Sequence, residues 1–444
     1  MRQHASAGIT CLIALGLALT ANAATVNRST LDNGLTVLVV ENDSAQVVGV
    51  ALLVKVSALD ETEYGIGSRA ILQQIILTAG HQDLTGLAEV ASATISRQSG
   101  FGVHTDHDLA EAWVSLSSDE LDAGMARLRG FVFAPSLTDE TLKQAREFVH
   151  QGYDAAHRSP VQVTYELFRA AFHGSGPLAG PLEGGHEDVD RVTLDAVTRL
   201  HTERYVASNA VVCVVSPLPA SETVAAIERA FGDLPKRPAP PTTPLQALPA
   251  QSLVEVEGRT DMSHSSLVVG VPLAAPTAED AVAGELIAQV LEGPAGRLRR
   301  DRALFTALGL VIPSRVIEEH YPIAPLPIPL TRQPYLALHA MCAADNIERT
   351  RVGLLRQLLA LRTGSVSDTE MELARKRLIN AHALQYLKPS DAALRLAQRE
   401  AFGMQPETDA EFNARAAAIS REDLTAYALK HFTRHAIGLQ MPMM

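Results

Sequence analysis

Histidines and acids that could share a metal ion lie close together at two places in this chain. His104 and His107 flank Asp106 in the sequence GVHTDHD. Imidazole and carboxylate groups at such a spacing are able to ligate a metal. We favour the alternative, a polar strand or its turn. For the second place, EEHY at 318–321, we likewise favour a polar strand end over a ligand cluster.

Other motifs with a known chemistry are missing from the sequence. It has no glycine-rich phosphate loop, no serine–histidine–aspartate set with a local signature and no Cys-x-x-Cys pair. Cys213 and Cys342 lie in separate apolar runs, so we expect two buried free thiols, with a disulfide as the alternative. The net charge of −12 argues against nucleic acid and anionic membrane as partners.

One predicted helix carries two neutral amides at its centre, Gln73 and Gln74. It is the sequence GIGSRAILQQIILTAG at 65–80, which follows a strand and an acidic turn at 59–63. Its apolar residues recur at helical spacing, and they are Ile71, Leu72, Ile75, Ile76 and Leu77. By itself this pattern indicates a core helix with two polar residues on its rim.

The two halves of the chain repeat each other. Asp139 and Asp368 each begin a long helical pattern, and they are 229 residues apart (368 − 139). Pro160 and Pro389, which follow these helices, keep the same offset. The repeat predicts a tandem duplication in which each half is α+β, with a mainly antiparallel sheet packed with helices and its own core.

The N-terminal residues 1–23 are predicted to be a signal peptide. They have an apolar run at 9–20 and end in Ala21-Asn22-Ala23, a cleavage site of the A-x-A type. We therefore expect export, to the periplasm if the source is a Gram-negative bacterium, and no membrane span after cleavage. Retention of the peptide as an uncleaved anchor is the alternative.

The remaining chain is too long for one core and divides at a linker. The sequence LPKRPAPPTTPLQALP at 234–249 is proline-rich and should be extended and semi-rigid. The predicted N-terminal domain is 24–233 and the C-terminal domain is 250–444. A further turn signal, at 42–44, lies between the apolar runs 35–40 and 47–56, and it predicts a hairpin.

The order of these segments resembles the pitrilysin or insulinase family of metallopeptidases. The resemblance is to the short type, which includes mitochondrial processing peptidase subunits, and it covers about residues 28–441. It rests on segments in the same order, which are LDNGLTVLVV at 31–40, a second strand, the acidic turn, the helix at 65–80, the strand with GVHT at 102–105 and the long helix after Thr138. The tandem α+β halves joined by a linker agree with it.

The resemblance also implies a zinc site that these residues cannot form. The family carries His-x-x-Glu-His on this helix, with two histidine ligands and a glutamate as general base. The apolar frame places Ala70, Gln73 and Gln74 at those positions, and Gly152 at the third ligand on the long helix. We therefore expect no metal, no cofactor and no catalytic residue in this chain, with zinc only in a partner subunit.

The family's second functional element, an arginine and a tyrosine that help to bind substrate, is only partly matched. Arg297-Leu298 and Gly309-Leu310 agree with its pattern, but Ile312 occupies the tyrosine position. Arg302 is our candidate for the substrate-binding arginine. The alternative for the basic run at 297–302 is a solvated helix face.

The resemblance implies a catalytically silent subunit, one that is not an enzyme by itself. It would complete the peptide-binding chamber of a zinc-bearing paralogous partner, as a heterodimer that admits unfolded peptides. A stand-alone peptide-binding or chaperone-like protein is the first alternative, and an enzyme of another chemistry is the second. The predicted peptide-binding residues are Gly102, Val103, His104 and Thr105, as the edge of a strand, and Arg302.

Overall fold

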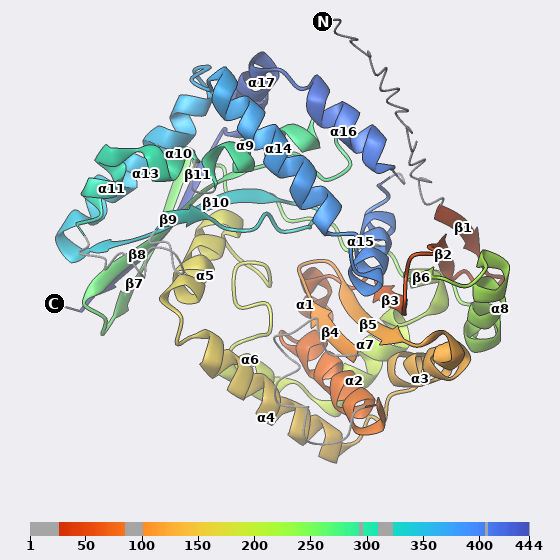
Figure 1. The fold of residues 1–444 in the computed structure, drawn as a ribbon. Helices are drawn as coiled ribbons and strands as arrows, with labels where there is room; N and C mark the ends of the chain where they lie inside the picture. Colours follow the sequence, from red (N-terminus) through yellow and green to blue (C-terminus); the bar gives the residue numbers. More distant parts are fainter. Residues whose placement is uncertain (1–25, 85–100, 293–295, 310–322, 405–406, 444) are drawn as a thin grey trace, which may run out of the picture.

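The protein is built from two mixed sheets that are covered by helices (Figure 1). The computed structural model describes residues 26–84, 101–292, 296–309, 323–404 and 407–443. Within these residues, sheet A has six strands in the order β1-β2-β6-β3-β5-β4. They are β1 (Val26–Thr30), β2 (Thr36–Glu41), β3 (Val48–Val54), β4 (Phe101–Thr105), β5 (Ala110–Leu116) and β6 (Ala210–Ser216).

Sheet B repeats this plan in the C-terminal half. Among the described residues it has five strands in the order β7-β11-β8-β10-β9. They are β7 (Leu253–Thr260), β8 (His264–Pro272), β9 (Ile323–Pro325), β10 (Tyr335–Ala343) and β11 (His435–Pro442). One pair in each sheet is parallel, β2 with β6 and β7 with β11, and the other pairs are antiparallel. The predicted α+β class with mainly antiparallel sheets is confirmed.

The helices follow the repeat of the strands. Those of the N-terminal half are α1 (Glu61–Tyr64), α2 (Ser68–Leu84), α3 (Leu121–Phe133), α4 (Asp139–Ala156), α5 (Pro160–His173), α6 (His186–Arg191), α7 (Leu194–Arg204) and α8 (Ala220–Phe231). Those of the C-terminal half are α9 (Ala281–Leu291), α10 (Arg297–Arg300), α11 (Arg302–Ala307), α13 (Ile347–Leu361), α14 (Asp368–Leu384), α15 (Pro389–Ala401), α16 (Asp409–Ala418) and α17 (Arg421–His431). Each half has a large apolar core of its own residues.

The duplication extends to individual side chains. Arg146 on α4 donates to the carbonyl oxygen of Val192 at 2.8 Å, and Arg375 on α14 donates to that of Ile419 at 2.8 Å. Both long helices also begin with a capping box, in which the first side chain and the residue three positions later bond each other's backbone N–H. The same local chemistry therefore begins and anchors the long helix in each half.

The predicted hairpin between the runs 35–40 and 47–56 is wrong. Strand β6, from near the end of the N-terminal half, lies between β2 and β3 and pairs with both. The turn at Asn33–Gly34 instead joins β1 to β2, which pair as antiparallel neighbours. A short loop after a strand favours a hairpin, but the apolar side chains of β6 are buried most completely at the centre of the sheet.

Two helices are exchanged between the halves, which the sequence did not predict. Helix α5 belongs to the N-terminal half but packs on β11, β8 and β7 of sheet B. Helix α15 belongs to the C-terminal half but packs on β3 and β6 of sheet A. In Figure 1 the two helices lie against the sheets of the opposite halves. Each sheet therefore has one face covered by its own half and the other face covered by its neighbour.

The exchanged helices bury apolar surface from both halves. On sheet A the shared cluster includes Leu53, Trp113 and Val211 with Ala393 and Ala397. On sheet B the buried residues of the second shared cluster are Phe168, Ala171, Phe172, Val268, Tyr335, Ala337 and Ala436. Burial of apolar area stabilises by about 25 cal/mol per Å², so each half depends on the other for part of its stability.

Residues 234–249 form no helix or strand, and they are bonded to both halves. Ser208 donates to the carbonyl of Arg237 at 2.7 Å, on the N-terminal side. Arg332 of the C-terminal half donates to the carbonyl of Thr243 at 2.8 Å. The domain boundaries at 233 and 250 stay a prediction.

The two cysteines of the described residues are free and buried, Cys213 in β6 and Cys342 in β10. The expectation of two buried free thiols is therefore confirmed, and burial raises the pKa of both thiols. Among the described helices, none has the length and apolar character to cross a bilayer. The predicted signal peptide at 1–23 lies outside the described residues.

Candidate functional site

Helix α2, where the zinc motif was expected, is held at its first turn by a buried acid. Glu61 accepts the backbone N–H groups of Gly67 at 3.1 Å and Arg69 at 3.0 Å. The guanidinium of Arg69 lies 3.7 Å from the same carboxylate, and both side chains are buried. Burial raises the pKa of the Glu61 carboxyl, while Arg69 and the two N–H groups oppose that rise. The acidic turn is therefore the anchor of α2.

The four positions expected for the three zinc ligands and the general base carry no acid and no imidazole. Ala70 is buried on α2, and Gln74 is half-buried with its amide nitrogen 3.4 Å from the hydroxyl of Thr78. Gly152 is exposed on α4, and a Cβ there would meet no atom within 4 Å. An alanine and a glycine have no ligand atom, and a neutral amide oxygen is a weak ligand for zinc.

Gln73, at the position of the general base, holds α2 against the sheet. Its amide nitrogen donates to the carbonyl oxygen of His104 on β4 at 3.2 Å and lies 3.4 Å from that of Glu111. One turn earlier, Arg69 donates to the carbonyl oxygen of Asp106 at 2.6 Å. A glutamate that is ionised at neutral pH has no proton to donate at this position. Gln73 therefore has a structural role that an ionised glutamate at this position could not have.

The residues present do not fit a zinc ion. Within the described parts of the chain, no group of three or more His, Cys, Asp or Glu side chains is arranged to hold a metal. His107 is buried and its Nδ1 is bonded to the carboxylate of Asp106, whereas His104 is exposed on β4. The favoured interpretation, a polar strand and its turn, agrees with these positions. Residues 318–321 lie outside the described residues.

The predicted peptide-binding strand is β4, which lies at one edge of sheet A beside α2. It pairs with β5 on one side, and no strand of the described residues pairs with its other side. An unpaired strand edge presents N–H and C=O groups that can bond an incoming strand. Residues 102–105 thus lie where strand addition would require them, although peptide binding there stays a prediction.

The direction of the backbone groups on β4 follows from the turn after it. Asp106 donates its N–H to the carbonyl of Leu109 at 3.0 Å, which is a bond toward β5. Along an antiparallel strand, successive residues direct their N–H and C=O groups alternately toward and away from the neighbouring strand. His104 therefore bonds toward β5, whereas Val103 and Thr105 direct their backbone groups to the open edge.

Trp113 is a natural reporter for this edge. It is the only tryptophan of the chain, it lies opposite Gly102 on β5, and its side chain is buried. A Cβ at Gly102 would lie 2.4 Å from the indole ring, so the ring lies over β4 because residue 102 has no side chain. Its fluorescence should respond when a peptide binds to this edge.

Arg302 is not brought to β4 within one chain. It is exposed at the start of α11, which packs on α13 and α10 in the opposite half, and Figure 1 shows α11 far from β4. Arg297 is not on a solvated helix face, because it is bonded to Glu370 at 2.9 Å and both side chains are 11% exposed. Residues 310 and 312 lie outside the described residues.

We expect the purified protein to retain no stoichiometric zinc after dialysis against trace zinc. The physical reason is the loss of ligand atoms at positions 70, 74 and 152. The measurement is elemental analysis of the dialysed protein. A matched variant with Ala70→His, Gln73→Glu, Gln74→His and Gly152→Glu should take up about one zinc per chain. One zinc on the wild type, lost on replacement of His104 or His107, would contradict the expectation.

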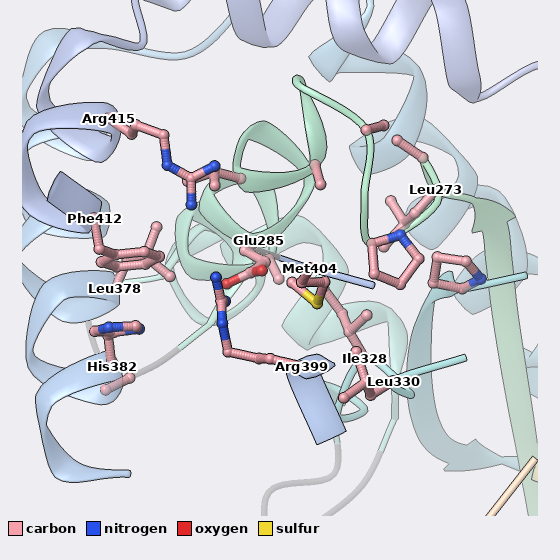
Figure 2. Close-up of a pocket in the computed structure, with 18 of the residues that line it drawn as sticks. Leu273, Glu285, Ile328, Leu330, Leu378, His382, Arg399, Met404, Phe412 and Arg415 are labelled. Atoms are coloured by element: carbon pink, nitrogen blue, oxygen red, sulfur yellow. The ribbon is translucent and has the colours of Figure 1, made fainter. Parts of the chain in front are cut away.

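The sequence analysis missed a cavity of about 1130 Å³ in the C-terminal half. It lies between α9, α14 and the segment Pro325–Leu330 (Figure 2), and Arg395 and Arg399 of α15 also line it. One signal for it was present in the sequence. The apolar frame of α2 recurs in α9, as Leu286-Ile287 and Val290-Leu291. The polar residues that face the cavity, however, come from segments far apart in the chain.

Comparisons with known proteins agree with these observations. Residues 191–378 match the sequence profile of a family described as "Peptidase M16 inactive domain". Two curated relatives are each described as an uncharacterized zinc protease. The one from Rickettsia felis is 20% identical over 245 residues, 55% of this chain and 58% of the relative. The one from Mycobacterium leprae is 24% identical over 258 residues, 56% of each. The chain thus spans little more than half the length of these relatives.

Solved structures match the fold over nearly the whole chain. A protease from Helicobacter pylori has a TM-score of 0.78 and 18% identity, and the match covers 95% of this chain and 100% of that one. A peptidase M16 inactive domain from Pseudomonas fluorescens has a TM-score of 0.77 and 18% identity, over 95% and 98%. A chain of complex III2 from Candida albicans has a TM-score of 0.71 and 14% identity, over 94% and 96%.

The profile match, the relatives and the two-domain fold confirm the resemblance stated from the sequence. M16 is the peptidase family of the pitrilysin or insulinase type, and the positions of its zinc motif hold Ala70, Gln73, Gln74 and Gly152 here. The protein is an M16 peptidase family homologue that carries the family's inactive domain.

Proposed function

We propose that this protein is a catalytically silent M16 subunit that completes the peptide-binding chamber of a zinc-bearing partner. The observation that carries the proposal is Gln73, which occupies the position of the general base and donates instead to the carbonyl of His104. The site lacks the residues for zinc-dependent hydrolysis, but α2 still supports the edge of β4, where a peptide would add as a strand. A protein retained for peptide binding rather than hydrolysis would keep this arrangement.

The two sheets differ in a way that favours β4 for peptide addition. The corresponding edge of sheet B is β9, where the N–H of Leu326 donates toward β10, to the carbonyl of Ala337 at 2.8 Å. Pro325 and Pro327 flank Leu326 and have no N–H for an incoming strand. Strand addition is therefore disfavoured at β9 and available at β4.

A partner is part of the proposal because the zinc-motif positions of this chain hold no acid and no imidazole. That one structural match is a chain of complex III2 supports a role inside an assembly. In this proposal the predicted signal peptide directs export, to the periplasm if the source is a Gram-negative bacterium. The partner would be a paralogue with an intact His-x-x-Glu-His motif, and the substrates would be unfolded peptides.

The test uses a purified relative that has the intact zinc motif and is encoded beside this chain. We expect the two proteins to elute together on size exclusion, and we expect the partner's peptidase activity on an unfolded peptide to rise severalfold when this chain is added. The chain alone should have no activity. Separate elution at micromolar concentration, with unchanged activity, would refute the proposal.

A stand-alone peptide-binding protein is the second candidate, because the open edge of β4 is complete within one chain. In that case the purified chain would bind unfolded peptide and suppress its aggregation without any partner. Equal peptide affinity with and without the zinc-bearing relative would favour this candidate over the silent subunit.

A further inference from the structure

The cavity of the C-terminal half is the counterpart of the degenerate zinc site. Helices α2 and α9 follow corresponding strands of the two sheets, β3 and β8, and pack on the corresponding long helices, α4 and α14. Aligning their buried apolar frames places Glu285 opposite Ala70 and Gln289 opposite Gln74, with the same burial at nearly every position. In the C-terminal half, the position that corresponds to the degenerate zinc site is a cavity lined by charged groups.

The cavity is lined by three arginines, Arg395, Arg399 and Arg415. Figure 2 shows the carboxyl group of Glu285 and the guanidinium groups of Arg399 and Arg415 directed toward the same region. Glu407 bonds both arginines, Arg399 at 3.2 Å and Arg415 at 2.6 Å, and its side chain is only 9% exposed. One carboxylate, that of Glu407, therefore forms ion pairs with two guanidinium groups.

Arg395 adds a third positive charge to the cavity, near the carboxyl of Glu285. It lies one turn before Arg399 on the face of α15 that lines the cavity. Its Nε is buried without a hydrogen-bond partner, and no ion pair joins Arg395 to another described residue. A ligand anion beside this half-buried guanidinium would form a charge-assisted hydrogen bond with it.

Glu285 does not neutralise this charge with a direct ion pair among the described residues. Burial raises the pKa of its carboxyl, while the charges of the nearby arginines oppose that rise. Three other acids of the lining, Glu279, Glu292 and Glu411, are exposed and are screened by solvent more than the half-buried Arg395. The region around Arg395 and Arg399 therefore carries the positive charge of a lining that is otherwise acidic.

Apolar side chains form part of the walls of the cavity. Figure 2 shows Leu273, Ile328, Leu330 and Phe412 around it, and Phe412 stacks on His382 at 3.7 Å between ring centroids. Burial lowers the pKa of His382, so this ring is neutral at pH 7. The volume of about 1130 Å³ reaches the upper end of the usual range for ligand pockets, roughly 300–1,000 Å³, which gives room for several apolar side chains.

The proline-rich wall distinguishes a peptide from a simple fatty acid. Pro325, Pro327 and Pro329 have carbonyl oxygens but no N–H groups, so this segment can accept hydrogen bonds but has few backbone donors of its own. A peptide has backbone N–H donors for such a wall, whereas a fatty acid has none. The wall and the arginines together favour a ligand with an apolar body, backbone donors and one anionic end.

We propose that the cavity binds the free carboxylate end of an apolar peptide, with Arg395 as the group that bonds the carboxylate. This inference deepens the proposed function, because it rests on peptide binding by the chain and names a second subsite in the other half. A peptide held at β4 by its backbone and at this cavity by its end would be recognised at two places. The pairing of Arg395 with a carboxylate is a charge-assisted bond.

The test is fluorescence anisotropy on the purified full chain with a short, N-terminally labelled apolar peptide. Its free acid should bind about tenfold more tightly than its C-terminal amide, which lacks the charge. Arg395→Gln should weaken binding of the acid about tenfold and remove the preference over the amide. Glu285→Gln should strengthen binding of the acid, because it removes a competing negative charge. A thermal midpoint for each variant separates these effects from unfolding.

Equal binding of acid and amide would overturn the proposal, and so would an Arg395→Gln variant that keeps the preference for the acid. Weaker binding by Glu285→Gln would show that the cavity prefers a cation. Displacement of the peptide by dodecanoate at lower concentration than by the unlabelled peptide would assign the cavity to lipids instead. These results need no partner, so failure here leaves co-elution with a zinc-bearing relative as a separate test of the proposed function.

Discussion

Replacing Gly438 by alanine is expected to reduce the free energy of unfolding by about 3 kcal/mol or more, or to prevent folding. Gly438 lies in β11 under the exchanged helix α5. A Cβ there would lie 2.3 Å from the backbone nitrogen of Phe168 and 2.5 Å from the carbonyl oxygen of Thr164. Backbone atoms cannot move aside as side chains do, so α5 would have to rise from sheet B.

Gly49 gives the matching experiment on sheet A. A Cβ at this position in β3 would lie 2.1 Å from the backbone of Pro389 and 2.2 Å from that of Ser390, at the start of α15. Gly49→Ala should therefore lower the stability by a similar amount. The two exchanged helices depend on glycines at these two contacts, one on each sheet.

The control is Gly152→Ala on the exposed face of α4, where a Cβ meets no atom within 4 Å. This change should raise the stability by about 0.5–1 kcal/mol, because alanine favours a helix more than glycine does. Urea unfolding followed by circular dichroism measures all three variants. A Gly438→Ala protein as stable as the wild type would mean that α5 is held only loosely on sheet B.

Replacing Val103 by proline is expected to reduce peptide binding about tenfold or more while the fold survives. The N–H of Val103 is directed to the open edge of β4, so proline removes a donor that an incoming strand would use and no bond to β5. Binding by the wild type should be broad and weak, on the order of micromolar or poorer, because ordering a flexible peptide costs free energy. The loss of one hydrogen bond between β4 and the peptide is then a large part of the total free energy of binding.

The measurement is anisotropy of a labelled, unfolded basic peptide, with Trp113 fluorescence as a second signal. Val103→Ala is the matched control, because it removes the same side chain and keeps the N–H. The net charge of −12 should favour basic peptides, with affinity that falls as salt rises. Equal binding by Val103→Pro and Val103→Ala would exclude the edge of β4 from peptide binding, and so would the absence of binding by the wild type.

Local signals in the sequence determined the helices and the repeat. Thr138 and Ser367 each cap a long helix with a side chain that bonds the backbone N–H three residues on, and such bonds depend only on neighbouring residues. The offset between Asp139 and Asp368 follows from the duplication, so it needed no structure. The loss of zinc chemistry was equally local, because alanine and glycine have no ligand atom in any fold.

Only the tertiary structure decided how distant segments meet. The insertion of β6 between β2 and β3, and the exchange of α5 and α15, depend on which buried surfaces pack best once the whole chain is compact. Neither arrangement leaves a pattern in neighbouring residues. A duplicated sequence predicts two similar halves, and it is silent on whether each half covers its own sheet.

For the candidate sites too, the sequence predicted some features and the tertiary structure decided the others. The sequence identified Gln73 and the strand at 102–105, but not the bond from Gln73 to the carbonyl of His104, because that bond joins residues 31 positions apart. The cavity could not be predicted in the same way, since Glu285, Arg395 and the proline-rich wall come together only when α9, α15 and the segment at 325–330 pack in the folded chain. Residue types determined what these groups are able to bind, and long-range packing determined which of them share a site.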